Sequence, residues 1–233
     1  MSAVTREGFD LVTRSVLIVE DDALLRELIA VALERHGFVV ETAASAADAK
    51  RAFSRGDHDA VVLDVSLGPG PNGFDLADAL RAQAPHVAIV FLTNLPDSRF
   101  AERDPKGLPG GVAYLRKTSL SDVDALIEAL DSTLRGRDAS AYRQDSDPNR
   151  PMGGLTRKQI AVLRLAASGM SNQQIADNRG VSVKAVEDTI SRASKVLDID
   201  TAAEGNLRVA AVRRFLAVTG GTPPTVSYEP PRP

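Results

Sequence analysis

Six polar residues stand just behind apolar runs in the first half of the chain. They are Glu20, Asp21 and Asp22 after residues 16–19, Asp64 after 60–63, Thr93 after 87–92, and Lys117 after 112–115. The carboxyl ends of parallel strands meet at one edge of a sheet, and open α/β sheets bind their ligands at that edge. If the apolar runs are such strands, the sequence predicts an acidic pocket that also holds one hydroxyl and one ammonium group.

These residue types together favour phosphoryl chemistry. Neighbouring carboxylates repel one another, and a hard divalent cation such as Mg²⁺ relieves the repulsion by binding their oxygens. A carboxylate such as Asp64 can attack phosphorus and form an acyl phosphate, while the metal and the Lys117 ammonium neutralise the developing charge. The Thr93 hydroxyl can then bond a phosphoryl oxygen and act as a switch. Taken singly, Asp64 is typical of a cap or turn residue and Lys117 of a solvated charge, but their combination favours a phosphoacceptor site.

The spacing of apolar residues predicts the fold that positions this pocket. Five short runs fit strands buried on both faces of a parallel sheet, at residues 16–19, 38–40, 60–63, 87–92 and 112–115. Helical periodicity separates the runs, so we expect a (βα)5 doubly wound, flavodoxin-like α/β domain with right-handed crossovers. Residues 93–111 hold three prolines and three glycines, so the fourth crossover helix should be short or irregular.

The second half of the chain predicts a small all-α domain of four helices. The helices are expected near residues 156–168, 171–179, 182–197 and 206–218. Thr156, Ser171 and Ser182 are suitable N-caps, and Gly180 breaks the chain before the third helix. A short helix, a tight turn and a longer helix are typical of a helix-turn-helix. A plain helical bundle used for dimerisation is the alternative on spacing alone.

Composition suggests the domain limits and excludes some functions. We place the first domain at residues 15–136, a polar linker at 137–154, the helical domain at 155–219 and a disordered, proline-rich tail at 220–233. The absence of cysteine excludes disulfides and thiol catalysis, and we expect neither a signal peptide nor a membrane span. Residues 1–150 carry 17 Lys and Arg against 24 Asp and Glu, whereas residues 151–233 carry 11 against 7. Contact with a polyanion is therefore expected only from the second half.

The first domain resembles the receiver domain of two-component response regulators. The likeness covers residues 15–135 and rests on Leu17-Ile18-Val19-Glu20-Asp21-Asp22, Leu63-Asp64-Val65-Ser66-Leu67, Asn72-Gly73-Phe74, Leu92-Thr93 and Tyr114-Leu115-Arg116-Lys117. It implies that Asp64 is the phosphoacceptor. It assigns Mg²⁺ to Glu20, Asp21, Asp64 and the Ser66 backbone carbonyl, and it makes Thr93, Tyr114 and Lys117 the switch and phosphate-binding residues. Asn94 and Thr118 depart from the family pattern, which bears on the signalling face more than on the phosphorylation site.

The second domain resembles the LuxR-type output domain of the NarL/FixJ-like subfamily. The likeness covers residues 155–218 and includes Val162-Leu163-Arg164-Leu165-Ala166, Gly169-Met170-Ser171-Asn172 and Lys195-Val196-Leu197. It implies DNA contacts from Ser182, Lys184, Ser191, Arg192 and Lys195, and dimerisation through Leu207, Ala211 and Phe215. Glu187 and Thr189 stand where that family has a basic residue and a histidine, and Asp188 adds a second acid. Acidic side chains that face phosphates weaken binding.

Together these patterns predict a phosphorylation-controlled transcription regulator rather than an enzyme. The expected partners are a sensor histidine kinase, duplex promoter DNA and a second copy of the chain, in the cytoplasm and without membrane contact. The alternative is a receiver-controlled interaction protein whose helical domain has lost DNA binding. A catalytic output is disfavoured because the helical half has no histidine, no cysteine and no paired carboxylates in a credible pocket.

Overall fold

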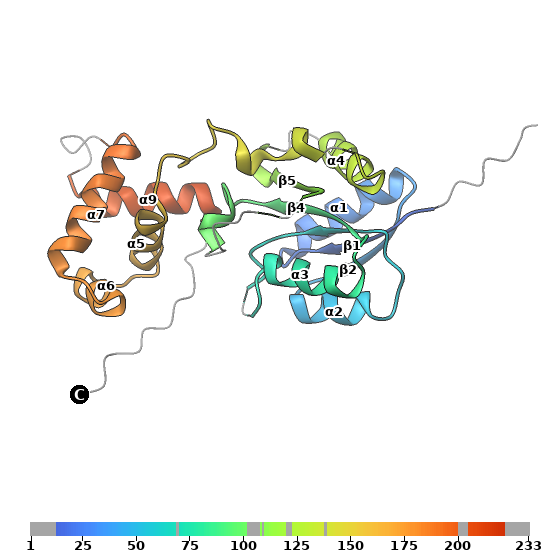
Figure 1. Cartoon of the computed structure of the whole chain (residues 1–233), viewed down its shortest axis with the longest axis horizontal. Coiled ribbons are helices and arrows are strands. Elements are labelled where there is room, and N and C mark those ends of the chain that lie inside the picture. The colour runs from blue at the N-terminus through green and yellow to red at the C-terminus, as the bar shows by residue number, and fades with distance from the viewer. Residues whose placement is uncertain are drawn as a thin grey trace, which may run out of the picture.

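The computed structural model describes residues 13–68, 70–101, 108, 110–119, 123–137, 139–199 and 205–221. Within these ranges an N-terminal domain of sheet and helices is followed by a helical domain (Figure 1). The tail predicted to be disordered lies outside the described residues from position 222 onward. Among the described helices, none combines the length and apolar character that a membrane crossing requires.

The sheet of the N-terminal domain has five parallel strands in the order β2-β1-β3-β4-β5. They are β1 (Ser15–Val19), β2 (Val39–Ala43), β3 (Ala60–Leu63), β4 (Ala88–Thr93) and β5 (Val112–Arg116). Strands β3 and β4 are buried along their whole length, as runs without polar alternation predict. The strand positions and the doubly wound α/β fold predicted from the sequence are confirmed.

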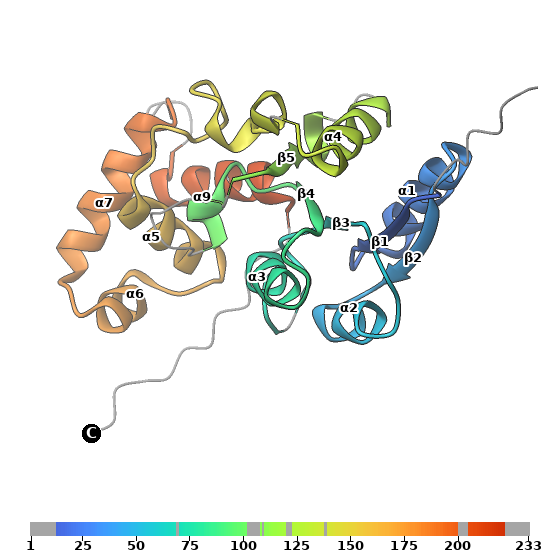
Figure 2. The same ribbon diagram turned by 45° about the vertical axis from the view of Figure 1, so that its right-hand side comes forward.

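Helices cover both faces of this sheet, as Figure 2 shows. Helices α1 (Ala23–Arg35) and α4 (Asp124–Leu134) enclose one apolar cluster, which includes Ile18 of β1. Helices α2 (Ala46–Phe53) and α3 (Gly73–Gln83) enclose the cluster on the opposite face. In the described part of the fourth crossover, only the four-residue 3-10 helix η1 (Ser98–Ala101) occurs, in accord with the prolines and glycines of this segment.

The helical domain contains the four predicted helices within about two residues of their expected ends. They are α5 (Arg157–Ala167), α6 (Asn172–Arg179), α7 (Val183–Val196) and α9 (Leu207–Thr219). Thr156 and Ser171 form capping boxes with the glutamines three residues later. Gly180 ends α6 with φ +61°, in the left-handed region that glycine adopts without strain. The helix-turn-helix spacing of α6 and α7 is therefore present.

The predicted linker is not a solvated spacer. Within residues 137–154 the chain forms η3 (Ala139–Tyr142) and η4 (Gln144–Ser146), which pack along β5. The Arg116 backbone N–H donates to Gln144 Oε1 at 2.8 Å, and Arg143 pairs with Asp145. A polar segment without periodicity predicts a spacer, but these polar groups instead satisfy the exposed edge of the sheet.

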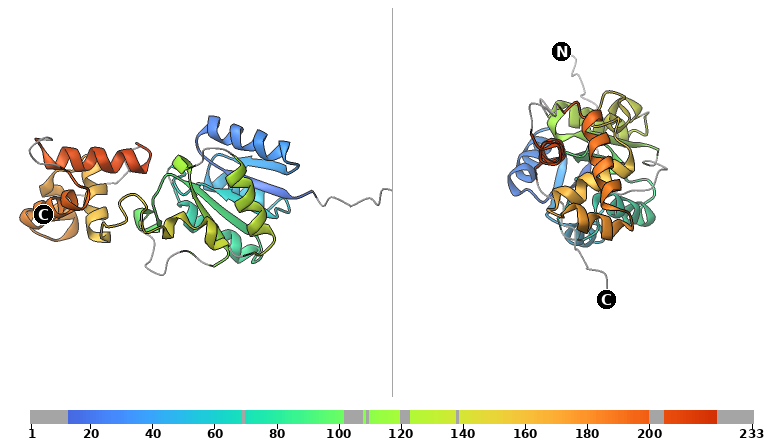
Figure 3. Two further views of the ribbon diagram at one scale, coloured as in Figure 1. Left: turned by 90° about the horizontal axis from the view of Figure 1, so that it is seen from above. Right: turned by 90° about the vertical axis from the view of Figure 1, so that its left-hand side faces the viewer.

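The two domains meet at the segment that follows β4, and Figure 3 shows them side by side along the long axis of the molecule. The Asp97 carboxylate is 4% exposed and bonds Arg99 Nη2 at 2.7 Å and Arg150 Nε at 2.8 Å. Arg99 also donates to the backbone oxygens of Gly153 and Leu155. The ring of Phe100 stacks on that of Phe215 in α9, with the centroids 5.8 Å apart. A buried ion cluster and an aromatic contact therefore join η1 to the helical domain.

Gly73 allows α3 to begin against the backbone of β3, and its replacement should destabilise the fold. A Cβ at Gly73 would lie 2.1 Å from the Asp64 carbonyl oxygen and 2.8 Å from Val65 Cα. We predict that Gly73→Ala lowers the free energy of unfolding by about 1–3 kcal/mol, because backbone atoms must move to make room. Urea unfolding measures the change. Gly110→Ala is the control, since a Cβ there meets nothing within 4 Å. Identical unfolding of Gly73→Ala and the wild type would contradict the tight contact.

Candidate functional site

Strand register brings three carboxylates together at the carboxyl edge of the sheet. Val19 of β1 pairs with Leu63 of β3, so the residues that follow, Glu20 and Asp64, are neighbours. Carboxylate oxygens of Glu20, Asp21 and Asp64 all lie within 4.8 Å of one another. Glu20 and Asp64 are buried, whereas Asp21 is exposed. The cluster therefore has two enclosed oxygen donors and one donor that is open to solvent.

Lys117 supplies the positive charge of this cluster from the end of β5. Its Nζ lies 2.6 Å from Glu20 Oε2 and 2.8 Å from Asp64 Oδ2. Burial lowers the pKa of Lys117, but the Asp64 and Glu20 carboxylates outweigh that effect and hold the pKa above its ordinary value. The ammonium group thus stays charged at neutral pH and bridges two strands.

Burial and the charge of Asp64 together disfavour the ionised form of Glu20, in spite of Lys117. The pKa of Glu20 is raised from an ordinary 4.5 to about 7, first because the side chain is buried and second because Asp64 is negative, while Lys117 opposes both effects. A further cation beside these oxygens would favour the ionised form of Glu20. The geometry and the charge both suit a hard divalent ion with oxygen ligands.

Three further residues lie at the edges of this cluster. The Ser66 backbone N–H donates to Asp64 Oδ1 at 3.2 Å, so the loop after β3 holds the carboxylate from one side. Asp22 caps α1 by accepting from the Leu25 N–H at 3.0 Å, and its role is structural. Arg26, which sequence reasoning missed, donates to the Glu20 backbone oxygen at 2.6 Å. The signal in the sequence was a basic residue in the first turns of α1, just after the acidic residues that it contacts.

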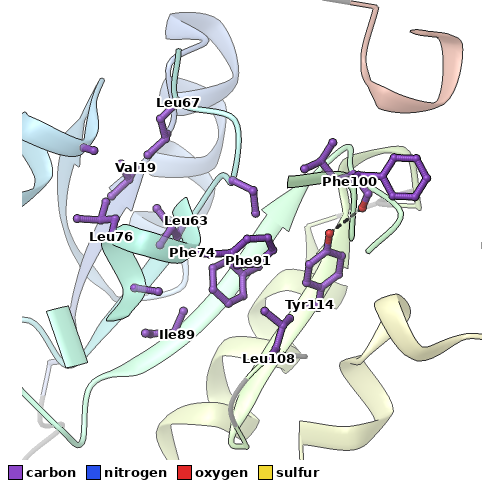
Figure 4. Close-up of a cluster of buried hydrophobic side chains, with 14 of the residues drawn as sticks. Val19, Leu63, Leu67, Phe74, Leu76, Ile89, Phe91, Phe100, Leu108 and Tyr114 are labelled. Atoms are coloured by element: carbon purple, nitrogen blue, oxygen red, sulfur yellow. Dashed lines mark hydrogen bonds between the residues drawn. The ribbon is translucent and has the colours of Figure 1, made fainter. Parts of the chain in front are cut away.

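Thr93 and Tyr114, two of the predicted switch residues, both hydrogen-bond the backbone of Leu95. Leu95 belongs to the loop after β4 that contacts the helical domain. Thr93 ends β4, is fully buried, and accepts from the Leu95 N–H at 3.4 Å. The Tyr114 hydroxyl donates to the Leu95 backbone oxygen at 2.8 Å, and its ring packs with Phe74 and Phe91 in the core (Figure 4). Burial raises the pKa of Tyr114 well above its ordinary value, so the phenol stays a donor. Both side chains therefore hold one backbone position.

The outer face of α7 carries the predicted DNA contacts. Lys184, Arg192 and Lys195 are exposed, Ser191 is half-buried, and the Ser182 side chain caps the helix by accepting from the Ala185 N–H. Lys184 Nζ lies 3.9 Å from Asp188 Oδ1, which partly neutralises it. Figures 1 and 2 show α7 on the side of the helical domain that faces away from the sheet. The N-terminal domain therefore does not cover this helix.

Three side chains that the sequence placed at binding surfaces are buried in the described structure. Thr189 is 5% exposed and donates to the Ala185 backbone oxygen, so it lies on the inner side of α7 rather than beside Glu187. Ala211 and Phe215, predicted at a dimer surface, are buried inside the chain, and Leu207 is half-buried. An apolar stripe has the same period whether it covers its own chain or a partner. Phe100 is the intramolecular partner that the sequence did not reveal.

Comparison with known proteins assigns both halves of the chain. Residues 16–131 match the response regulator receiver domain, and residues 154–200 match the luxR family of bacterial regulatory proteins. The chain is 32% identical over 175 residues to the transcriptional regulatory protein FixJ of Azorhizobium caulinodans, covering 74% of this chain and 80% of FixJ. It is 29% identical over 221 residues to the nitrate/nitrite response regulator protein NarP of Escherichia coli, covering 88% and 95% of the two chains.

The agreement of fold, acidic cluster and helix-turn-helix with both matches gives one conclusion. The sheet domain is the receiver, and the helical domain is the luxR-type output domain. The chain belongs to the two-component response regulators and regulates transcription through a luxR-type DNA-binding domain.

Proposed function

We propose that Asp64 accepts a phosphoryl group from a phosphohistidine of a sensor kinase. The observation that carries the proposal is the buried Asp64 carboxylate, held by Lys117 Nζ at 2.8 Å beside Glu20 and Asp21. An Asp64 oxygen attacks phosphorus as the bond from phosphorus to the histidine nitrogen breaks. That nitrogen keeps the electron pair and leaves as neutral imidazole, since the other ring nitrogen carries a proton. Lys117 then donates to a phosphoryl oxygen.

We assign Mg²⁺ to the same cluster. Glu20, Asp21 and Asp64 supply hard oxygen donors within 4.8 Å of one another, and the Ser66 backbone carbonyl is the proposed fourth donor. When bound, the ion supplies charge neutralisation for the phosphoryl oxygens. The raised pKa of Glu20 is consistent with this assignment, because burial and the Asp64 charge both disfavour a lone Glu20 carboxylate and a bound cation would favour it.

We propose that phosphorylation reaches the output domain through the segment between Thr93 and η1. A hydroxyl that moves toward a phosphoryl oxygen gives up its bond to the Leu95 N–H. The next residue, Asn94, is in contact with the C-terminal end of α9: a Cβ at Gly220 would lie 2.8 Å from Asn94 Nδ2. Phe100 of the same segment covers Phe215 of α9. Movement of this segment therefore loosens α9.

The docked arrangement supports control by assembly rather than by covering the DNA-reading helix. Helix α7 faces away from the receiver, whereas α9 packs against it. We propose that release of Phe215 allows α9 to pair with α9 of a second copy about a two-fold axis. A dimer presents two α7 helices to successive half-sites of promoter DNA. Because promoter DNA is the proposed partner, we assign the protein to the cytoplasm. We propose residues 15–136 as the receiver domain and residues 155–219 as the DNA-binding domain.

Phosphorylation should occur at Asp64 alone. Incubation with a small phosphodonor and Mg²⁺ should add one phosphoryl group, measured by intact mass, because the Asp64 carboxylate lies beside Lys117 and the proposed metal. Asp64→Asn should add none. Asp75→Asn, an exposed acid on α3, is the matched control and should react as the wild type does. A phosphoryl group on Asp64→Asn at the wild-type rate would refute the assignment.

Mg²⁺ binding should depend on the ionisation of Glu20, whose pKa is about 7. The metal requires the carboxylate, so the affinity at pH 6 should be about tenfold lower than at pH 8. At pH 8, Mg²⁺ at 100 times its Kd should raise the free energy of unfolding by about 2.7 kcal/mol. Thermal unfolding measures both effects. Glu20→Gln should remove most of the stabilisation, and the exposed Glu27→Gln should not; equal affinity at the two pH values would contradict the role of Glu20.

Loosening the contact between the domains should mimic phosphorylation. We expect the unphosphorylated wild type to sediment as a monomer and Phe100→Ala to form dimers without a phosphodonor, because Phe215 loses its cover. Phe38→Ala removes the same ring from a half-buried position in the opposite receiver cluster and is the control. If Phe100→Ala stays monomeric at concentrations where the phosphorylated wild type dimerises, α9 is not held by this contact.

DNA binding should rest on a few cations of α7. Lys195→Ala should weaken binding to all duplexes alike and reduce the log–log salt slope by about 0.9, as expected for one phosphate contact. Glu187→Lys should strengthen binding, since Glu187 is exposed among these cations. Lys50→Ala, on an exposed part of α2, controls for net charge. If neither the wild type nor Glu187→Lys binds duplex DNA at low salt, the interaction-protein alternative replaces DNA reading for this chain.

A further inference from the structure

A basic hollow lies where η1 of the receiver meets α5 and α6 of the output domain. Its volume is about 340 Å³, and its walls are Arg99, Arg157, Lys158, Ala161, Arg164 and Arg179. Five of these six side chains are cationic, they come from three elements of two domains, and no described acidic residue lines the hollow. This convergence differs from an ordinary solvated helix face, where cations and acids alternate.

Part of this positive charge has no counterpart among the described residues. Arg99 is neutralised by Asp97, and Arg157 and Arg164 take part in other interactions. Lys158 and Arg179 form no ion pair with any residue that the structure describes. Among the described residues, the charge without an ion-pair partner is therefore carried by one side chain of α5 and one of α6.

Two electrostatic effects make this arrangement costly for the isolated chain. Arg157 and Lys158 occupy the first turn of α5, which holds no acidic residue, and the helix dipole disfavours cations at that end. Half-buried Arg164 has a pKa that is lowered first by burial and second by the neighbouring Arg179. An anion in the hollow would offset both effects, because it is attracted by the helix N-terminus and by the neighbouring cations.

We propose that this hollow binds a small molecule that carries at least two linked phosphate groups. Arginine forks and a lysine point charge match phosphate oxygens, and two linked phosphates can reach Lys158 and Arg179 together. A hollow of about 340 Å³ has room for a diphosphate group. Because Arg99 of η1 forms one wall, an occupant would contact both domains and favour the docked arrangement. The proposal does not depend on phosphorylation of Asp64.

Calorimetric titration of inorganic pyrophosphate into the full-length chain, in metal-free buffer containing EDTA, tests the proposal. Saturable binding is expected for the wild type and for Asp64→Asn, with chloride at equal ionic strength giving no heat. Lys158→Gln and Arg179→Gln should each weaken binding about tenfold, as loss of a charged hydrogen bond of about 1.4 kcal/mol implies. The double variant Arg192→Gln with Lys195→Gln removes two exposed cations from α7 and should bind pyrophosphate as the wild type does.

A titration with duplex DNA completes the test, because the two hollow variants and the α7 double variant should each lose affinity for a different ligand. Duplex affinity should fall in the α7 double variant and persist in Lys158→Gln and Arg179→Gln. Pyrophosphate binding that is unchanged in Lys158→Gln and Arg179→Gln, or equally weakened in the α7 double variant, would overturn the proposal. Loss of duplex affinity but not of pyrophosphate affinity in the hollow variants would also overturn it, and would make this surface a contact for the DNA backbone.

Discussion

Lys117 holds the buried carboxylates of Glu20 and Asp64 together at the carboxyl edge of the sheet, and the charges of this trio do not balance. Burial and, second, the negative charge of Asp64 raise the pKa of Glu20 although Lys117 lies beside it. A parallel sheet buried on both faces imposes this proximity, because its strands end at one edge. Such a site suits a cation. It also suits a phosphoryl group, whose negative charge Lys117 and the bound cation would neutralise together. Binding of a cation at this site would relieve the repulsion between the Glu20 and Asp64 carboxylates.

The same edge of the sheet carries the connection to the output domain. Thr93 and Tyr114 both bond Leu95, and the segment beyond it contributes Asp97 and Phe100 to the contact between the domains. In the described part of this crossover, the 3-10 helix η1 takes the place of a longer helix. Helix α9 packs against this segment at Asn94 and Phe100. Thr93 at the end of β4 and the contact of Phe100 with α9 are therefore separated by only a few residues of backbone.

Much of this could be predicted from the sequence, for physical reasons. Apolar runs without alternation define buried strands, and polar residues at their ends define the site, so Glu20, Asp21, Asp64 and Lys117 were found together. The helices of the output domain follow from caps and period. What could not be predicted are contacts between segments far apart in the chain. Phe100 on Phe215 and the packing of the linker on β5 leave no periodic signal. For the same reason, the sequence did not show that Phe215 is covered by its own chain in this arrangement.

Hydrogen exchange of the backbone amides of α9 reports whether phosphorylation of Asp64 opens the contacts between the domains. Exchange is compared before and after phosphodonor and Mg²⁺ are added, with Asp64→Asn treated in the same way. We expect faster exchange in residues 93–101 and at the C-terminal end of α9 in the phosphorylated wild type alone, because the Leu95 and Phe215 contacts open. Exchange in α9 that is unchanged by phosphorylation, while intact mass confirms a phosphoryl group on Asp64, would contradict this expectation.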